Sequence, residues 1–157
     1  MIGKEVFRQF KAAEPNTVLL DGDEMRRIFH HDHIETDYTV EGRRENARRI
    51  TEICLWLDQN NINVVACVLS LFHDTQDWNR EHYKRYFEVF IDVPMEILAE
   101  RDIKDLYKPA MDGSIRNVVG VDIPFLPPKA PDMIIDNRVD GLDVKETAHR
   151  ILENALC

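Results

Sequence analysis

This chain has no long apolar run, few cysteines and no excess of basic charge, and each absence excludes a class of protein. No stretch approaches the ~20 apolar residues of a transmembrane helix, and the N-terminus shows no signal-peptide pattern, so we expect a cytoplasmic protein with no membrane partner. Cys54, Cys67 and Cys157 are scattered and odd in number, which is typical of a reducing compartment. The formal net charge of −9 argues against a nucleic-acid partner.

The sequence also lacks a glycine-rich phosphate loop of the form G-x-x-x-x-G-K-S/T. Such a loop lies between a first strand and a helix, and its backbone N–H groups bind nucleotide phosphates. In this sequence a helical pattern starts at once, because Ile2, Val6, Phe10 and Ala13 recur at helical spacing. The pattern predicts the helix that would follow such a loop, without the strand and the loop before it.

Helical and strand patterns alternate along the rest of the chain. Short apolar runs predict strands at 17–21, 62–69, 86–92 and 132–136, and helical periodicity predicts helices at about 43–59, 75–84, 94–101 and 144–155. The alternation predicts one domain over residues 1–157, with a parallel sheet covered by helices on both faces. Residues 102–131 are rich in proline, glycine and cations, which indicates a long functional loop.

Two carboxylates flank a glycine where the strand at 17–21 ends. Asp21 and Asp23 enclose Gly22, and Arg26 follows one turn later. Ligands of open α/β sheets gather at the carboxyl ends of strands, and a phosphoryl-transfer site needs carboxylates for Mg²⁺ or the acceptor hydroxyl. The alternative is a strand that ends in a solvated Asp-Gly turn.

A basic cluster is expected at the start of the helix at 43–59. Cations at a helix N-terminus oppose the macrodipole, and a bound anion would offset that cost of ~0.3–1 kcal/mol each. The alternative is a solvated charged face, with Glu45 as a helical partner. The cluster consists of Arg43, Arg44, Arg48 and Arg49.

Two further places are candidates for substrate contact. Ser70, at the end of the strand at 62–69, either contacts substrate or caps the next turn. The cationic segment 101–108, continuing to 117–122, is either a lid over phosphates or an ordinary surface loop. By contrast, His30, His31 and His33 match no zinc spacing, so we expect no metal site there.

Taken together, these residues resemble the adenylyl-sulfate kinases, P-loop kinases that phosphorylate the 3′-hydroxyl of adenylyl sulfate in sulfate assimilation. The resemblance covers about residues 2–137 and rests on LLDGDEMR, TVEGRRENARRI, ACVLSLF, YFEVFIDVP, RDIKDLYKPAMDGSIRNVVGVDIPF and PDMIIDN. It implies a three-layer α/β P-loop-kinase fold whose first strand and phosphate loop are absent. It also implies ATP and Mg²⁺ as cofactors and a small nucleotide as substrate, and it leaves a homodimer open.

The resemblance implies roles for individual residues. Asp21 and Asp23 are the catalytic acidic pair near Mg²⁺ and the acceptor hydroxyl, with Asp21 as the metal ligand. Arg26, Arg43 and Asn46 hold the anionic end of the substrate. The whole implied substrate-binding set is Arg26, Tyr38, Arg43, Asn46, Leu69, Ser70, Lys104, Lys108, Asn117 and Val118.

The sequence departs from the family pattern in several respects, which include Glu24 in place of the usual asparagine and Leu71 in place of a usual proline. The family's first strand lies between the strands at 62–69 and 86–92, so a gap is expected there; a truncated gene model, a cloning boundary or a degenerate paralogue would each explain it. Tyr38 matches one of two rings that hold the adenine, but Val118 replaces the other, at a cost of ~1–3 kcal/mol in stacking.

The segments L-S-L-F and N-V-V-G-V-D-I-P-F are similar to a divergent branch that includes cytidine diphosphoramidate kinases of capsule synthesis. Three functions therefore stay open: an adenylyl-sulfate kinase, a cytidine diphosphoramidate kinase, and a non-catalytic nucleotide-binding remnant. Without the phosphate loop, whether the chain is an active enzyme also stays open.

Overall fold

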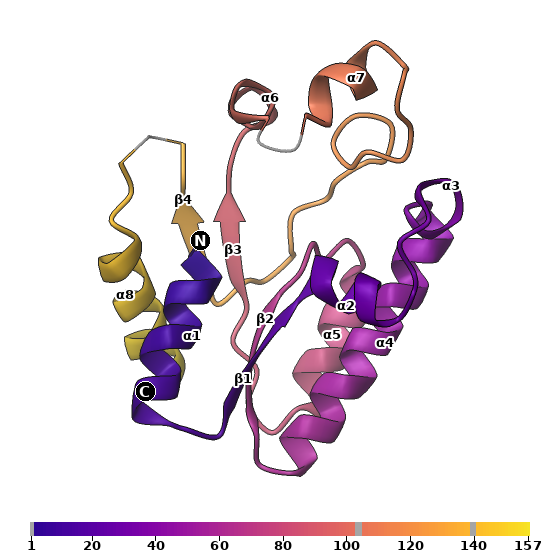
Figure 1. The fold of residues 1–157 in the computed structure, drawn as a ribbon. Helices are drawn as coiled ribbons and strands as arrows, with labels where there is room; N and C mark the ends of the chain where they lie inside the picture. The colour runs from indigo at the N-terminus through magenta and orange to yellow at the C-terminus, as the bar shows by residue number, and fades with distance from the viewer. Residues whose placement is uncertain (1, 103–104, 139–140) are drawn as a thin grey trace.

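Helices and parallel strands alternate along the chain in the computed structural model, which describes residues 2–102, 105–138 and 141–157 (Figure 1). The elements in order are α1 (Ile2–Ala13), β1 (Thr17–Asp21), α2 (Gly22–Ile28), α3 (Ile34–Asp37), α4 (Val40–Gln59), β2 (Asn63–Cys67), α5 (His73–His82), β3 (Val89–Asp92), α6 (Met95–Arg101), α7 (Tyr107–Met111), β4 (Met133–Asp136) and α8 (Val144–Leu156). In the described parts of the chain, no helix is both long and apolar enough to cross a membrane.

The strands form two separate parallel pairs. β1 pairs with β2, in a register that runs from Thr17↔Asn63 to Asp21↔Cys67. β3 pairs with β4, and Asp92 lies opposite Asp136 at their carboxyl ends. Within the described ranges no hydrogen-bonded ladder joins β2 to β3. The sheet is therefore interrupted at the position where the sequence predicted a gap.

Helices cover the strands from two sides, which confirms the predicted α/β layers (Figure 1). On one side α4 packs against β1 and β2 around a core of Leu20, Met25, Ile50, Cys54 and Leu57. On the other side α1 and α8 build a second core of Val6, Ile135, Ala148 and Ile151. Val65 of β2 and Val89 of β3 both pack against this second core, so α1 and α8 connect the two strand pairs.

The first turn of α1 packs closely against the end of β2. A Cβ atom at Gly3 would overlap the Sγ atom of Cys67, so glycine is required for this approach. Burial, followed by the Asp21 carboxylate, raises the pKa of the Cys67 thiol. The N-terminal end of α1 therefore lies beside the carboxyl ends of β1 and β2.

The predicted boundaries were wrong in several places; the strand expected at 62–69 ends at Cys67, and the strand expected at 86–92 begins at Val89. α4 begins at Val40 rather than near residue 43, because the Thr39 hydroxyl accepts the Gly42 N–H and caps the helix. The short helices α2 and α3 were not predicted, since they have too few turns for an apolar period. The loop expected at 102–131 contains the short helix α7 and an isolated bridge between Val119 and Ile123.

Candidate functional site

Asp21 ends β1 and caps α2. Its Oδ1 atom accepts hydrogen bonds from the backbone N–H groups of Asp23 at 3.1 Å and Glu24 at 3.3 Å. A carboxylate at this position satisfies helix N–H groups that otherwise lack partners. Asp21 thus has a structural role in the turn, and Asp23 lies exposed in the first turn of α2.

Arg26 is buried and joins α2 to the corner between α3 and α4. Its Nη1 atom donates to the carbonyl oxygen of Asp37 at 2.8 Å. Its guanidinium carbon lies 4.6 Å from the ring centroid of Tyr38, within the range of a cation–π contact. Arg26 therefore holds the backbone and the ring at this corner.

Arg43 connects the same corner to a segment far along the chain. Its Nε atom donates to the carbonyl oxygen of Tyr38 at 2.8 Å, and its Nη2 atom donates to that of Asn117 at 2.8 Å. Its guanidinium carbon also lies 5.5 Å from the Tyr38 ring centroid. Arg43 thus contacts both Tyr38 and Asn117, and all three belong to the expected substrate-binding set.

Two cations share this half-buried space. Burial lowers the pKa of Arg43, and the positive charge of Arg26 lowers it further. The carboxylates of Asp122 and Asp23 act in the opposite direction. Concentrated positive charge at low solvent exposure favours an anionic ligand.

The carboxylate of Asp122 holds the segment 117–123 in a tight turn. Asp122 accepts the backbone N–H groups of Asn117 at 2.7 Å and Val118 at 2.6 Å, and these bonds lower its pKa. Gly120 has φ +88°, a conformation that favours glycine, and it lies against the side chain of Met95. The segment therefore presents Asn117 to Arg43 while Val118 is buried.

Asn46 lies on α4 one turn after Arg43. The residue is only 6% exposed, and its Oδ1 atom has no hydrogen-bond partner in the described structure. Buried polar atoms are nearly always satisfied, and an exception needs a specific explanation. An N–H or O–H group of a ligand would supply the missing donor.

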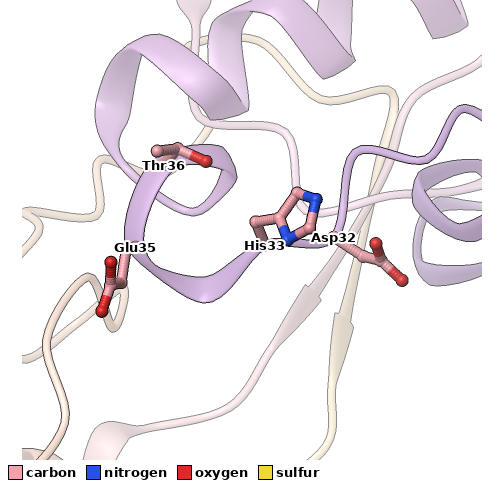
Figure 2. Close-up of a pocket in the computed structure, with 4 residues that line it drawn as sticks. All are labelled: Asp32, His33, Glu35 and Thr36. Atoms are coloured by element: carbon pink, nitrogen blue, oxygen red, sulfur yellow. The ribbon is translucent and has the colours of Figure 1, made fainter.

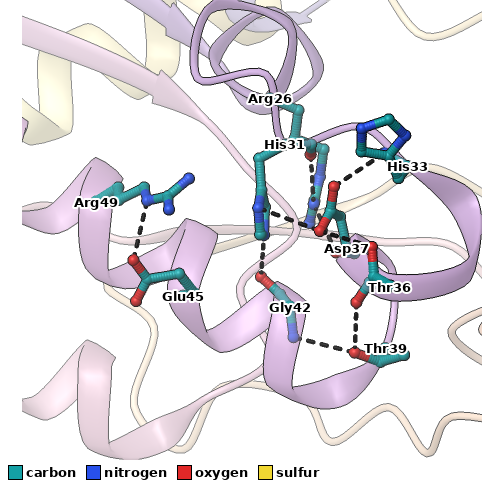
Figure 3. A network of polar contacts seen from close by, with 9 residues as sticks. All are labelled: Arg26, His31, His33, Thr36, Asp37, Thr39, Gly42, Glu45 and Arg49. Atoms are coloured by element: carbon teal, nitrogen blue, oxygen red, sulfur yellow. Dashed lines mark hydrogen bonds and ion pairs between the residues drawn. The ribbon is translucent and has the colours of Figure 1, made fainter.

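The other arginines of the basic cluster pair with carboxylates. Arg44 lies 2.8 Å from Asp74. Arg48 and Arg49 lie 3.0 Å and 2.9 Å from Glu45 and lower its pKa to about 2 (the Arg49 contact is drawn in Figure 3). For these three side chains the solvated charged face is the better interpretation, and the anion-binding prediction is retained for Arg43.

The remaining predicted residues lie apart from these contacts. Ser70 accepts a hydrogen bond at 3.0 Å from the Nε2 atom of the buried Gln76, and Leu69 is 58% exposed. Lys108 is exposed on α7, where its backbone N–H donates to Asp102. Lys104 lies outside the described residues. The structure thus supports a structural contact for Ser70, and the roles of the two lysines stay predictions.

A cavity of about 620 Å³ opens beside α3 and is lined by Asp32, His33, Glu35 and Thr36. Figure 2 shows that the two carboxylates point away from each other rather than toward a common centre. Across the ranges described, no group of three or more His, Cys, Asp or Glu side chains is arranged to hold a metal ion.

Arg26, Tyr38 and Arg43 were predicted from the sequence, but a second set of contacts in this corner was not. His31, Asp37 and Gly42 form a network between the end of α2 and the start of α4 (Figure 3). One signal was present, because Thr39 followed by V-E-G fits a helix N-cap. The contacts of Asp37 with Arg26 and His31 have no comparable local signature, since both partners lie outside α3.

Comparisons with known proteins agree on one family. Residues 1–136 match the family described as adenylylsulphate kinase. The chain is 36% identical over 136 residues to the cytidine diphosphoramidate kinase of Campylobacter jejuni, covering 87% of this chain and 77% of that protein. It is 33% identical over 154 residues to the adenylyl-sulfate kinase of Halothermothrix orenii, covering 97% and 80%. It also resembles the solved structure of the Mycobacterium tuberculosis APS kinase CysC in complex with AMPPNP and APS, with a TM-score of 0.84, 25% identity and coverage of 99% and 89%.

Proposed function

This chain belongs to the adenylylsulphate kinase family, and we propose that its acceptor site binds adenylyl sulfate. The family reaction is the ATP-dependent phosphorylation of the 3′-hydroxyl of that nucleotide. The observation that carries the proposal is the cluster of Arg26, Tyr38 and Arg43, followed one turn later on α4 by the unpartnered Oδ1 atom of Asn46. Together, α2, the end of α3 and the start of α4 thus supply positive charge, an aromatic ring and a buried hydrogen-bond acceptor.

Each component suits one part of such a nucleotide. Arg26 and Arg43 provide the positive charge for the sulfate and phosphate groups, and charge-assisted hydrogen bonds to anions are about twice as strong as neutral ones. Asn46 accepts a hydrogen bond from a hydroxyl or amino group of the ligand. Asp23 lies within electrostatic reach of Arg43, where a carboxylate can orient the acceptor hydroxyl.

The two implied cofactors fit the described residues differently. Mg²⁺ in kinases is usually held by one or two carboxylates together with phosphates and water, so Asp21 and Asp23 suit it without a dedicated cage. The phosphates of ATP need a run of backbone N–H groups, and the sequence contains no glycine-rich loop to supply it. The described residues therefore do not fit ATP, and we derive no transfer step from them.

A second candidate substrate is a cytidine nucleotide. Val118 is buried and offers no second ring against a base, so stacking on Tyr38 is one-sided. The loss of one stacking face costs ~1–3 kcal/mol and removes an advantage that the larger adenine would have. The Campylobacter jejuni relative, named for cytidine diphosphoramidate, supports this alternative.

Calorimetry with adenylyl sulfate and cytidine 5′-diphosphate tests the proposal and ranks the two bases. A parallel assay with MgATP and adenylyl sulfate compares the 157-residue chain with a version extended by a strand and a glycine-rich loop. We expect the chain to bind nucleotide without turnover, and the extended version to transfer phosphate. If neither nucleotide binds at millimolar concentration, the pocket assignment fails and the non-catalytic remnant replaces it.

A further inference from the structure

The His31 ring lies between two elements of the corner. Its Nδ1 atom is 3.3 Å from Oδ1 of Asp37 on α3, and its Nε2 atom is 3.0 Å from the carbonyl oxygen of Gly42 on α4 (Figure 3). The side chains of His31 and Asp37 are only 14% and 12% exposed. Solvent therefore competes little for either ring nitrogen.

Both partners of the ring are hydrogen-bond acceptors. A backbone carbonyl oxygen cannot donate. The Asp37 carboxylate accepts the His33 backbone N–H at 2.9 Å and the Thr36 hydroxyl at 3.0 Å, and these contacts lower its pKa, so it too is an acceptor. A neutral imidazole carries one N–H group and can satisfy one partner, whereas the imidazolium carries two and can satisfy both.

The contacts of His31 lie one residue away from the proposed nucleotide site. Asp37 precedes Tyr38, and Gly42 precedes Arg43. The two backbones approach so closely that a Cβ atom at Gly42 would lie 2.6 Å from backbone atoms of Asp37. A change in the spacing of this corner would therefore shift the Tyr38 ring and the Arg43 guanidinium relative to each other.

We propose that His31 is a positioning residue for the nucleotide site. Its doubly protonated ring holds Asp37 and Gly42 together, and this in turn sets the spacing between Tyr38 and Arg43. When the ring loses a proton, one of the two contacts becomes a repulsion between lone pairs, the corner loosens and nucleotide affinity falls.

The charges that face the ring come from each packed element. From α3, the Asp37 carboxylate faces the Nδ1 atom of the ring. From α2, the cationic Arg26 lies close by, with its Nη1 atom 3.5 Å from the His31 carbonyl oxygen. From α4 the facing group is the uncharged Gly42 carbonyl, and His33 on the same loop also acts on the charge of Asp37.

The expected change in nucleotide affinity rests on the proposed function, whereas the effect of the His31 ring on the corner can be tested without nucleotide. On the ¹⁵N-labelled chain, we would follow the His31 ring nitrogens and the backbone amides of Tyr38 and Arg43 from about pH 5.5 to about pH 8.5. We expect the amide shifts to follow the His31 ring titration in the parent. In His31→Gln, whose side chain does not titrate, the pH-dependent shift of the Tyr38 and Arg43 amides should disappear. In His33→Gln this shift should remain.

Calorimetry with adenylyl sulfate at both ends of this pH range provides the second readout. The parent should bind about threefold or more weaker at the high end, and His31→Gln should show little pH dependence. Amides that do not follow the ring, or a His31→Gln variant with the parent's pH profile, would overturn the inference. If no nucleotide binds at either pH, the proposed function fails, and the amide titration still decides the role of His31. Thermal melts would confirm that His31→Gln is folded; His31→Asn serves if it is not.

Discussion

Arg43 donates a hydrogen bond from its Nη2 atom to the carbonyl oxygen of Asn117, which lies 74 positions further along the chain, at 2.8 Å. The same guanidinium donates from Nε to the carbonyl oxygen of Tyr38. One side chain thus connects the segment 117–123 to the corner before α4. The contact explains how segments that are distant in the sequence build one candidate site.

Replacing Arg43 with alanine should weaken adenylyl sulfate binding by about tenfold or more, because both the cation and the connection to Asn117 are lost. The affinity of Arg43→Lys for adenylyl sulfate should lie between those of the parent and Arg43→Ala, since lysine keeps the charge but lacks the planar guanidinium group. Arg49→Ala is the matched control, because Arg49 pairs with Glu45. Calorimetry on all three would contradict the account if Arg43→Ala and Arg49→Ala bound equally well.

Asn46→Leu should separate binding from stability. The buried Oδ1 atom has no partner, and such an atom costs ~1–3 kcal/mol, so leucine should leave the melting temperature unchanged or raise it. Nucleotide affinity should fall, because the acceptor for the ligand is gone. Asn154→Leu on the exposed face of α8 is the control. An Asn46→Leu variant with parental affinity would refute the assignment of this acceptor.

Asp37→Asn should lower stability in a pH-dependent manner. Hydrogen bonds from the His33 backbone and the Thr36 hydroxyl lower the pKa of Asp37 in the folded chain. A carboxyl with a lowered folded pKa stabilises the fold above its ordinary pKa of about 3.9, and this contribution is lost as the pH falls through the folded value. The difference in melting temperature between parent and variant should therefore be clear at about pH 7 and shrink as the pH falls below the ordinary pKa of about 3.9.

Asp32→Asn serves as the control for that series, because Asp32 is exposed on the loop before α3. Its melting temperature should follow that of the parent across the range. A difference for Asp37→Asn that stayed constant, or grew in acid, would show that its carboxylate is not stabilised by these bonds.

The interrupted sheet should be visible in hydrogen exchange. Alternate N–H groups of β2 and β3 point away from their partner strands, and in the described structure no ladder joins these two edges. We expect these amides, within 63–67 and 89–92, to exchange as fast as those on the outer edges of β1 and β4. Strong protection of every amide in β2 and β3 of the monomer would mean that another segment fills the gap.

Local sequence patterns predicted most of the fold but little of the corner. The strands and the long helices follow from apolar periodicity, as in the stripe of Ile50, Cys54 and Leu57 that packs on β1 and β2. The sequence also placed the acids Asp21 and Asp23 at the end of β1, while the functional roles of Arg43 and Asn46 stay predictions. By contrast, the contact of Arg43 with Asn117 depends on tertiary structure, and the spacing of residues in the sequence does not predict it.

Two other features escaped prediction for different reasons. Helical spacing alone fitted both an anion-binding cluster and a solvated charged face. The structure favours the second for Arg44, Arg48 and Arg49, because carboxylates lie within ion-pair distance of each. The His31 network was missed because His30, His31 and His33 were considered only as a metal site, which their spacing did not support. Its actual partners, Asp37 and Gly42, lie in the next two helices.

Mapping the bound nucleotide by NMR tests the central claim most directly. Titration of adenylyl sulfate into the ¹⁵N-labelled chain should shift the amides around Arg26, Tyr38, Arg43, Asn46 and Asn117, and leave those of α8 unchanged. Shifts centred on α1 and α8, or no shifts at millimolar nucleotide, would contradict the assignment of the acceptor site to this corner.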